Sequence, residues 1–480
     1  MNSRISCCLG AGLFVLAICL TATPAGSETP RHPADLDLSP LTFERPEPVR
    51  TELPCGIPVL LFENHDLPLV TVTARLQMGT RYLAPDRHTA CHLLSRLWKD
   101  GGTKSQTPEE LEAREAALGI TLQAWVGSMI GYVSVSLVSQ DLPEALPLWR
   151  DLLRRPGFAA ERLERAKDRM LKDVQAINDN PDRLADLYFA RLLFGEHTPG
   201  AHEQTRAGIE AVDEQEIRAL YSGFVRPEHA VIGVAGDFDP DEIVAQLERL
   251  LGDWTPMGDP LPREPYTWTP QSRPGVYLVP AEFEQSQIRI GYLVPEMTTV
   301  SPDYPAVRIL EFALGYGRVF YRTRGDGLSY GTGTLFEVGE DFSRFYGTGS
   351  TGHEKVDDLI AAVREEVNGL RDTPLSAPEV EMSRTFVVGT VVQDCETARE
   401  VVVDCIDNML RDRPADYAEA HLTGLQKTTV DEIGALADLY CQFGDSTVIL
   451  VIGDPEQVST PLAELNLGEV IRLDLERFGE

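Results

Sequence analysis

The chain has 480 residues and is 43% hydrophobic, which is enough for large cores and suggests two to four domains. Acidic residues outnumber basic ones by 75 to 43, and the resulting formal net charge of −32 excludes a partner bound through its phosphate backbone, such as a nucleic acid. The negative charge predicts a well-solvated surface, with cationic peptides as ligands being the other interpretation.

The N-terminus is typical of an export signal. Arg4 supplies positive charge, the apolar run Leu9 to Leu20 has signal-peptide length, and Thr23-Pro24-Ala25 offers a cleavage site. The apolar run is too short to span a bilayer comfortably, and no later segment has the character of a membrane span. We therefore expect residues 1–25 to be a signal peptide and the mature protein to be exported, to a bacterial periplasm, with lipid attachment at Cys19 as an alternative.

Cysteine usage gives no disulfide framework. Five of the eight cysteines remain after removal of the signal segment, and an odd number in so long a chain allows two bridges at most. The sequence leaves the pairing open for these five residues, which are Cys55, Cys91, Cys395, Cys405 and Cys441.

The first half of the chain has strands at both ends and helices between them. Residues 26–50 are Pro-rich and polar and are expected to form an extended segment. Periodicity and turn residues predict strands at 59–62, 69–73, 122–137 and 230–234, and helices over 87–99, from 107 onward, over most of 142–222 and over 239–251.

The second half begins after a Pro-rich segment. Residues 255–275 contain six prolines and are interpreted as a linker. The same order of elements then restarts, with strands predicted at 275–279, 288–293, 330–338, 343–349 and 447–452, a helix over 303–314 and further helices over most of 354–443.

The two halves resemble each other. In both, an apolar strand runs into Gly-Asp and then an acidic helix start, and Gly236 and Gly453 lie 217 residues apart. We infer a duplication rather than two unrelated strand–turn–helix units. The predicted fold class is α+β: two tandem homologous lobes, each a mostly antiparallel sheet with helices packed on one face. The expected boundaries are 51–254 and 276–465, followed by an acidic tail over 466–480.

A pair of histidines is the first chemical signal. His88 and His92 lie on one face of the predicted helix and can share a metal ion. The inverted zincin motif H-x-x-E-H has the same spacing, with the Glu activating a metal-bound water, but Cys91 stands at the Glu position here. One interpretation is therefore a variant metallopeptidase site formed by His88, Cys91 and His92.

The surrounding residues favour another register. They resemble the opening of the pitrilysin/insulinase family of metallopeptidases, in which the zinc-binding helix ends in a Gly-Thr turn; the matching segments are Leu67-Pro68-Leu69-Val70, Met78-Gly79, Ala90 and 97–104. Aligned on Gly101, the motif falls on residues 92–96. By this resemblance His92 is the first zinc ligand, Ser95 replaces the catalytic Glu and Arg96 replaces the second ligand.

The third zinc ligand of the family, a Glu on a later helix, supports this register. At the family's spacing, 77 residues after Arg96, the sequence has Asp173, and 178–181 (NDNP) resembles the turn that follows that helix. The same count from His92 reaches Arg169, which cannot bind a metal.

These substitutions imply that the zinc site is lost. Catalytic zinc needs three protein ligands and an open position, and His92 and Asp173 supply two at most. Arg96 places a permanent cation where the metal would lie, and Ser95 is no general base near neutral pH. We expect Arg96 to pair with Asp173 and this chain to carry no metal.

Residues 318–332 (RVFYRTRGDGLSYGT) resemble the family's C-terminal segment, in which an Arg and a Tyr bind the substrate backbone. Tyr330 matches the Tyr, whereas the Arg position falls on Thr323, so Arg322 or Arg324 is the candidate. A guanidinium and a phenol both donate hydrogen bonds to peptide carbonyls. A solvated Arg cluster beside a core Tyr is the alternative.

The resemblance also implies that substrate lies along an exposed edge strand of the first lobe. The corresponding stretch is 122–127, with Ala124 and Trp125 at its centre. Main-chain pairing there would be β-augmentation, which has little sequence specificity. An ordinary paired strand explains the same pattern.

The resemblance covers residues 50–460 and implies a non-catalytic homologue. Such a subunit would pair with an active H-x-x-E-H subunit as a heterodimer, or form a homodimer, and help to bind a peptide in a shared chamber, with zinc in the active partner alone. The alternatives are a standalone periplasmic peptide-binding or scaffold protein, and an active enzyme that uses His88, Cys91 and His92.

Overall fold

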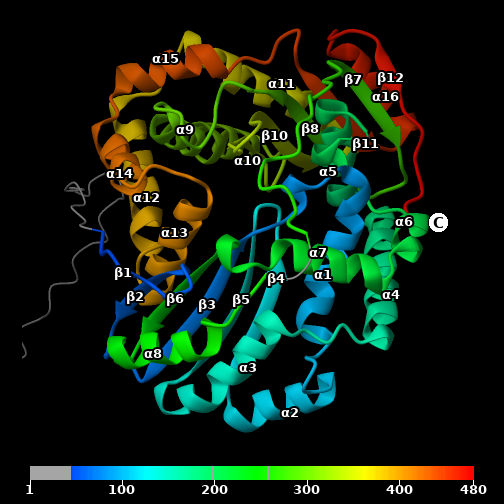
Figure 1. Cartoon of the computed structure of the whole chain (residues 1–480). Coiled ribbons are helices and arrows are strands. Elements are labelled where there is room, and N and C mark those ends of the chain that lie inside the picture. The colour runs from blue at the N-terminus through cyan, green and yellow to red at the C-terminus, as the bar shows by residue number, and fades with distance from the viewer. Residues whose placement is uncertain (1–44, 197, 257–258, 480) are drawn as a thin grey trace, which may run out of the picture. The chain divides into compact units, whose positions relative to one another are not determined.

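A computed structural model describes residues 45–479, apart from 197 and 257–258 (Figure 1). The expected signal peptide over 1–25, Cys19 and most of the 26–50 segment lie outside the described residues. Among the helices that are described, none combines the length and the apolar composition that a membrane crossing requires.

The first sheet has six strands in the order β1-β2-β6-β3-β5-β4. The parallel pair is β2 with β6, and the other neighbours are antiparallel. The strands are β1 (Val49–Glu52), β2 (Pro58–Glu63), β3 (Leu69–Gln77), β4 (Thr121–Val126), β5 (Ile130–Val138) and β6 (Ala230–Gly236).

The second sheet repeats this pattern in the order β12-β7-β11-β8-β10-β9. Its strands are β7 (Gly275–Pro280), β8 (Ser286–Leu293), β9 (Gly333–Glu337), β10 (Arg344–Thr351), β11 (Val448–Gly453) and β12 (Val470–Arg472). The order β7-β11-β8-β10-β9 and its strand directions match β2-β6-β3-β5-β4. This confirms the predicted α+β fold with two lobes and supports the duplication.

Helices cover the core side of each sheet. Those of the first lobe are α1 (His88–Asp100), α2 (Pro108–Leu118), α3 (Leu142–Arg154), α4 (Ala160–Gln175), α5 (Pro181–Phe194), α6 (Arg206–Ala211), α7 (Glu214–Phe224) and α8 (Pro240–Leu251). Those of the second are α9 (Tyr304–Glu311), the π-helical segment η8 (Phe312–Val319), α10 (Phe320–Gly325), α11 (Val356–Asn368), α12 (Ala377–Gln393), α13 (Ala398–Leu410), α14 (Tyr417–Lys427), α15 (Val430–Tyr440) and α16 (Pro455–Glu464).

The lobes exchange one helix each, which the sequence did not predict. Figure 1 shows α13, in orange, beside the strands of the first sheet, and α5 beside β11 of the second. The apolar face of α13 packs on Leu60, Val231 and Ala235. Gly233 permits this approach, because a Cβ there would overlap the side chain of Val402. Each sheet is therefore covered on its second face by the other lobe.

An arginine in each sheet binds the exchanged helix. Arg75 on β3 donates to Asp407 on α13, with its Nη2 at 2.7 Å from Oδ2. Arg289 on β8 is 2% exposed and donates to Asp186 and Asp182 on α5, at 2.7 and 2.5 Å. Because a buried cation is costly unless it is paired, these contacts favour this one arrangement of the helices.

The expected linker and tail both pack against the lobes. In 255–275, Trp268 contacts Phe194 and Phe342, with ring centroids 5.8 and 4.7 Å away. In 466–480, β12 adds to β7, and Phe478 is buried against Tyr188. The tail is acidic in composition, but its apolar residues complete both lobes.

Candidate functional site

Helix α1 presents three of the predicted site residues on one face. His92, Ser95 and Arg96 are spaced i, i+3 and i+4, which places them side by side. The opposite face is apolar and buried. The helix ends at the Gly101-Gly102 turn, and Gly102 adopts a φ of +69°, which favours glycine. This turn is the landmark that set the sequence register.

Arg96 and Asp173 form an ion pair, as expected from the sequence. The Nη2 atom of Arg96 lies 2.7 Å from Oδ2 of Asp173, and the side chains are 40% and 54% exposed. Asp173 lies on α4, whose core face holds Met170 and Val174 and so turns the carboxylate toward α1. The guanidinium thus joins α1 to α4 at the two positions that the sequence register assigns to the second and third ligands.

Ser95 is engaged in holding the edge of the first sheet. The backbone N–H of Val126, the last residue of β4, donates to Ser95 Oγ at 2.9 Å. A serine hydroxyl needs a neighbouring base to act in proton transfer, and here it serves as a structural acceptor.

A cluster of three histidines surrounds the start of this face. His92 and His202 have their pKa lowered to about 4, chiefly by burial and also by neighbouring His88. The rings of His88 and His202 are 5.0 Å apart, and His88 Nε2 lies 3.2 Å from the carbonyl of Leu83. Sequence reasoning missed His202, because it comes from a distant loop and has no motif around it.

The residues present do not fit a zinc ion. Among the described residues, no three His, Cys, Asp or Glu side chains converge on a metal-binding position. The alternative set of His88, Cys91 and His92 is wrong as a site, because Cys91 points into the core and is 1% exposed. Burial raises the pKa of its thiol to about 12, which disfavours the thiolate that binds zinc.

The predicted edge strand is confirmed as β4, which lies at the end of the first sheet. Trp125 is 50% exposed, and its ring centroid lies 6.0 Å from that of Tyr132 on β5. Ala124 is partly buried. Among the described strands β4 pairs with β5 alone. Two backbone N–H groups of its outer edge, those of Leu122 and Val126, donate to the side chains of Glu115 and Ser95 at 2.8 and 2.9 Å, so this edge is only partly open to another strand.

The second lobe distinguishes the two candidate arginines. Arg324 lies over the ring of Tyr330, with its Cζ 4.4 Å from the centroid, and Tyr330 is 80% exposed. Arg322 instead donates to Asp326 at 2.6 Å. Thr323, at the family's Arg position, is fully buried and bonds to the carbonyl of Val319. Arg324 with Tyr330 is therefore the pair available to a ligand.

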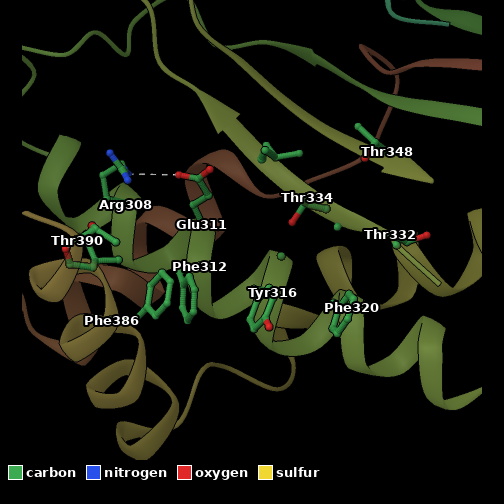
Figure 2. Close-up of a pocket in the computed structure, with 15 residues that line it drawn as sticks. Arg308, Glu311, Phe312, Tyr316, Phe320, Thr332, Thr334, Thr348, Phe386 and Thr390 are labelled. Carbon is green, nitrogen blue, oxygen red and sulfur yellow. Dashed lines mark hydrogen bonds and ion pairs between the residues drawn. The ribbon is translucent and has the colours of Figure 1, made fainter. Parts of the chain in front are cut away.

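A cavity of about 370 Å³ in the second lobe was not predicted from the sequence. It lies between the helical stretch Arg308–Phe320 and strand β9, and the rings of Phe312, Tyr316, Phe320 and Phe386 form one side of it (Figure 2). Burial raises the pKa of Glu311, at one end of it, to about 7.

Two family models match the chain. "Insulinase (Peptidase family M16)" covers residues 59–202, and "Peptidase M16 inactive domain" covers 211–386. The chain is 24% identical over 401 residues to an uncharacterized zinc protease of Mycobacterium tuberculosis, covering 81% of this chain and 90% of that protein. It is 20% identical over 374 residues to the mitochondrial-processing peptidase subunit beta of Dictyostelium discoideum, covering 74% and 78%.

Solved structures share the fold. A peptidase M16 inactive domain from Pseudomonas fluorescens superposes with a TM-score of 0.73 at 19% identity, covering 90% of this chain and all of that one. A protease from Helicobacter pylori gives a TM-score of 0.73 at 15% identity, covering 85% of this chain and all of that one.

Proposed function

The chain belongs to the insulinase (peptidase M16) family, and from this membership we propose that it is a non-catalytic subunit that pairs with a zinc-bearing member and helps to hold a peptide in a shared chamber.

The ion pair between Arg96 and Asp173 carries the proposal. Catalytic zinc needs three ligands and an open position. Here a permanent cation stands at the second ligand position and neutralises the acid at the third. His92 is the one unaltered ligand, and Ser95 offers no carboxylate to activate water.

Two exposed features support a role in peptide binding. The end strand β4, beside exposed Trp125, can add a peptide strand through those main-chain groups of its outer edge that Glu115 and Ser95 do not bind. Arg324 and Tyr330 offer donors to peptide carbonyls from the second lobe. Neither feature requires zinc, so both can persist in a subunit without catalysis.

The active site belongs to the partner in this proposal. A homodimer would combine two chains that both carry Arg96, so a heterodimer with an intact H-x-x-E-H subunit is the form that gives activity. Export of both subunits would bring them into one compartment, the bacterial periplasm. The export signal rests on residues 1–25 and remains a sequence prediction.

Mixing the purified chain with an H-x-x-E-H family member from the same organism tests the proposal. We expect co-elution in size-exclusion chromatography and faster cleavage of a peptide library than by the partner alone. Arg324→Gln should form the complex but give a smaller gain. Arg322→Gln is the matched control, because Asp326 already holds that side chain. If neither complex nor gain appears, the chain is a standalone binding or scaffold protein.

A further inference from the structure

The cavity of the second lobe occupies the position that corresponds to the α1–β4 region of the first. Strand β9 ends its sheet as β4 ends the other, and η8 packs on β9 as α1 packs on β4. The helix and strand touch at Gly315, where a Cβ would overlap the carbonyl of Thr334. The duplication has thus given the second lobe its own groove between a helix and the end strand of its sheet, and the backbone of that strand contacts Gly315 and Glu311 of the helix.

A stack of aromatic rings forms one wall of this groove. The centroids of Phe386 and Phe312 are 4.0 Å apart, and those of Phe312 and Tyr316, and of Tyr316 and Phe320, are 5.2 Å apart. Figure 2 shows these rings in a row beneath the strand. Tyr316 and Phe386 are 54% and 52% exposed, and such apolar exposure is typical of a binding surface.

The π-helical conformation of η8 positions the aromatic rings along the groove. Eight residues, Phe312–Val319, follow this wide helix, which is rare and is often found at functional sites. It interrupts an otherwise continuous helical stretch from Tyr304 to Gly325 at the point where the cavity lies.

Polar groups inside the groove are left without protein partners. Thr334 is 4% exposed, and within the described residues its hydroxyl has no hydrogen-bond partner. Its oxygen points from β9 toward the helix in Figure 2. Since a buried hydroxyl without a partner is costly, a ligand that supplies one would be favoured. Glu311 closes the end of the groove with Arg308, at 3.5 Å.

Next to the aromatic stack lies Arg324, a cation without an acidic partner among the described residues. Arg324 lies 5.5 Å from the centroid of Phe320 and 4.4 Å from that of Tyr330, which hold it between two rings. Throughout the described part of the chain no carboxylate forms an ion pair with it. In a protein of net charge −32, a fixed arginine without an acid is complementary to a carboxylate on a ligand.

We propose that this groove binds an extended peptide across the helix, with an aromatic side chain against the Phe312–Tyr316–Phe320 stack and an Asp or Glu side chain on Arg324. The inference rests on the proposed peptide-holding function and specifies its substrate class. One helical turn, about 6 Å, separates Phe320 from Arg324. An extended chain advances about 3.3 Å per residue with alternate side chains on one face, so the two recognised residues are spaced i and i+2.

Fluorescence polarisation on the isolated chain tests this. The probe is a labelled, acetylated and amidated nine-residue peptide with one phenylalanine and, two positions later, one glutamate. Tyr316→Ser should weaken binding about tenfold, and exposed Leu439→Ser, the control on α15, should not. Replacing the peptide's glutamate by glutamine should cost about fivefold with the wild type and nothing further with Arg324→Gln.

Several outcomes would overturn the inference. Equal binding of the phenylalanine and alanine peptides would exclude recognition by the aromatic stack, and equal binding of the glutamate and glutamine peptides to the wild type would exclude recognition by Arg324. Loss of binding in Trp125→Ser but not in Tyr316→Ser would place the peptide on β4. If Tyr316→Ser disrupts only the complex with the peptidase, the stack is a subunit interface.

The two proposals fail separately in these experiments. Peptide binding is measured without a partner, so a failed peptide assay leaves the pairing untouched, and a failed mixing experiment leaves the groove untouched. If Tyr316→Ser lowers the melting temperature, weaker binding by that variant could reflect partial unfolding. The combination of Arg324→Gln with the glutamine peptide then tests the inference, because Arg324 is exposed and its replacement should leave the fold intact.

Discussion

Arg96 on α1 and Asp173 on α4 are joined by an ion pair of 2.7 Å, at the positions that correspond to the second and third zinc ligands of the family. In the proposed register, a contact between two side chains stands where the family binds its metal between two helices.

The ion pair should contribute little to stability. Both side chains are about half exposed, and exposed pairs contribute about 0–1 kcal/mol. Arg96→Ala, Asp173→Ala and the double variant should each lower the free energy of unfolding in urea by less than about 1 kcal/mol. A coupling energy of several kcal/mol in this double-mutant cycle would show that the pair is an essential brace instead.

Restoring the ligands should restore metal binding. His92 is already neutral, because its pKa is about 4, and neutral imidazole is the form that binds zinc. The triple variant Ser95→Glu, Arg96→His, Asp173→Glu should take up about one zinc per chain in elemental analysis. The variant with Ser95→Glu alone is the control and should take up none. A triple variant that folds but stays metal-free would contradict the register of the site.

The histidine cluster should make the protein lose stability in mild acid. His92 and His202 have folded-state pKa values of about 4, below the unfolded value of about 6.5. Between those values the unfolded chain binds more protons, so the free energy of unfolding falls as pH falls from 6.5 toward 4. Each histidine contributes a slope of up to about 1.4 kcal/mol per pH unit.

The variant His202→Asn should flatten this slope, measured by urea unfolding at pH 7.5, 6 and 5. His65→Asn is the control, because hydrogen bonds to Asp237 and Glu63 raise the pKa of that exposed histidine and its contribution has the opposite sign. A slope that His202→Asn leaves unchanged would mean that the cluster is not neutral in the folded state.

The helix exchange should depend on one glycine. A Cβ at Gly233 would overlap Val402 of α13, so Gly233→Ala should cost about 1–3 kcal/mol of stability. Gly434, inside α15, has open space around its Cβ position, and Gly434→Ala should stabilise by about 0.5–1 kcal/mol. Thermal unfolding of the two variants separates these expectations, and equal effects would contradict the packing.

Local patterns predicted most elements of the fold. The alternation at 122–137 became β4 and β5, and the apolar run at 230–234 became β6. The helix expected over 303–314 continues instead to Gly325. Gly315 and Gly317 lower its helix propensity, but Gly315 is held by close packing on Thr334, which is a tertiary contact that no local pattern reveals.

The candidate site was predictable only where a motif marked it. The Gly-Gly turn and the spacing of Arg96 and Asp173 predicted the ion pair between these two residues. His202, the aromatic stack and the exchange of α5 and α13 were missed, because each depends on segments far apart in the chain. The choice between Arg322 and Arg324 likewise needed the position of Asp326.

Zinc analysis of the purified full-length chain tests the central claim most directly. After incubation with excess zinc and removal of free metal, we predict far less than one zinc per chain and no peptide cleavage without a partner. One tightly bound zinc per chain together with intrinsic peptidase activity would contradict the account.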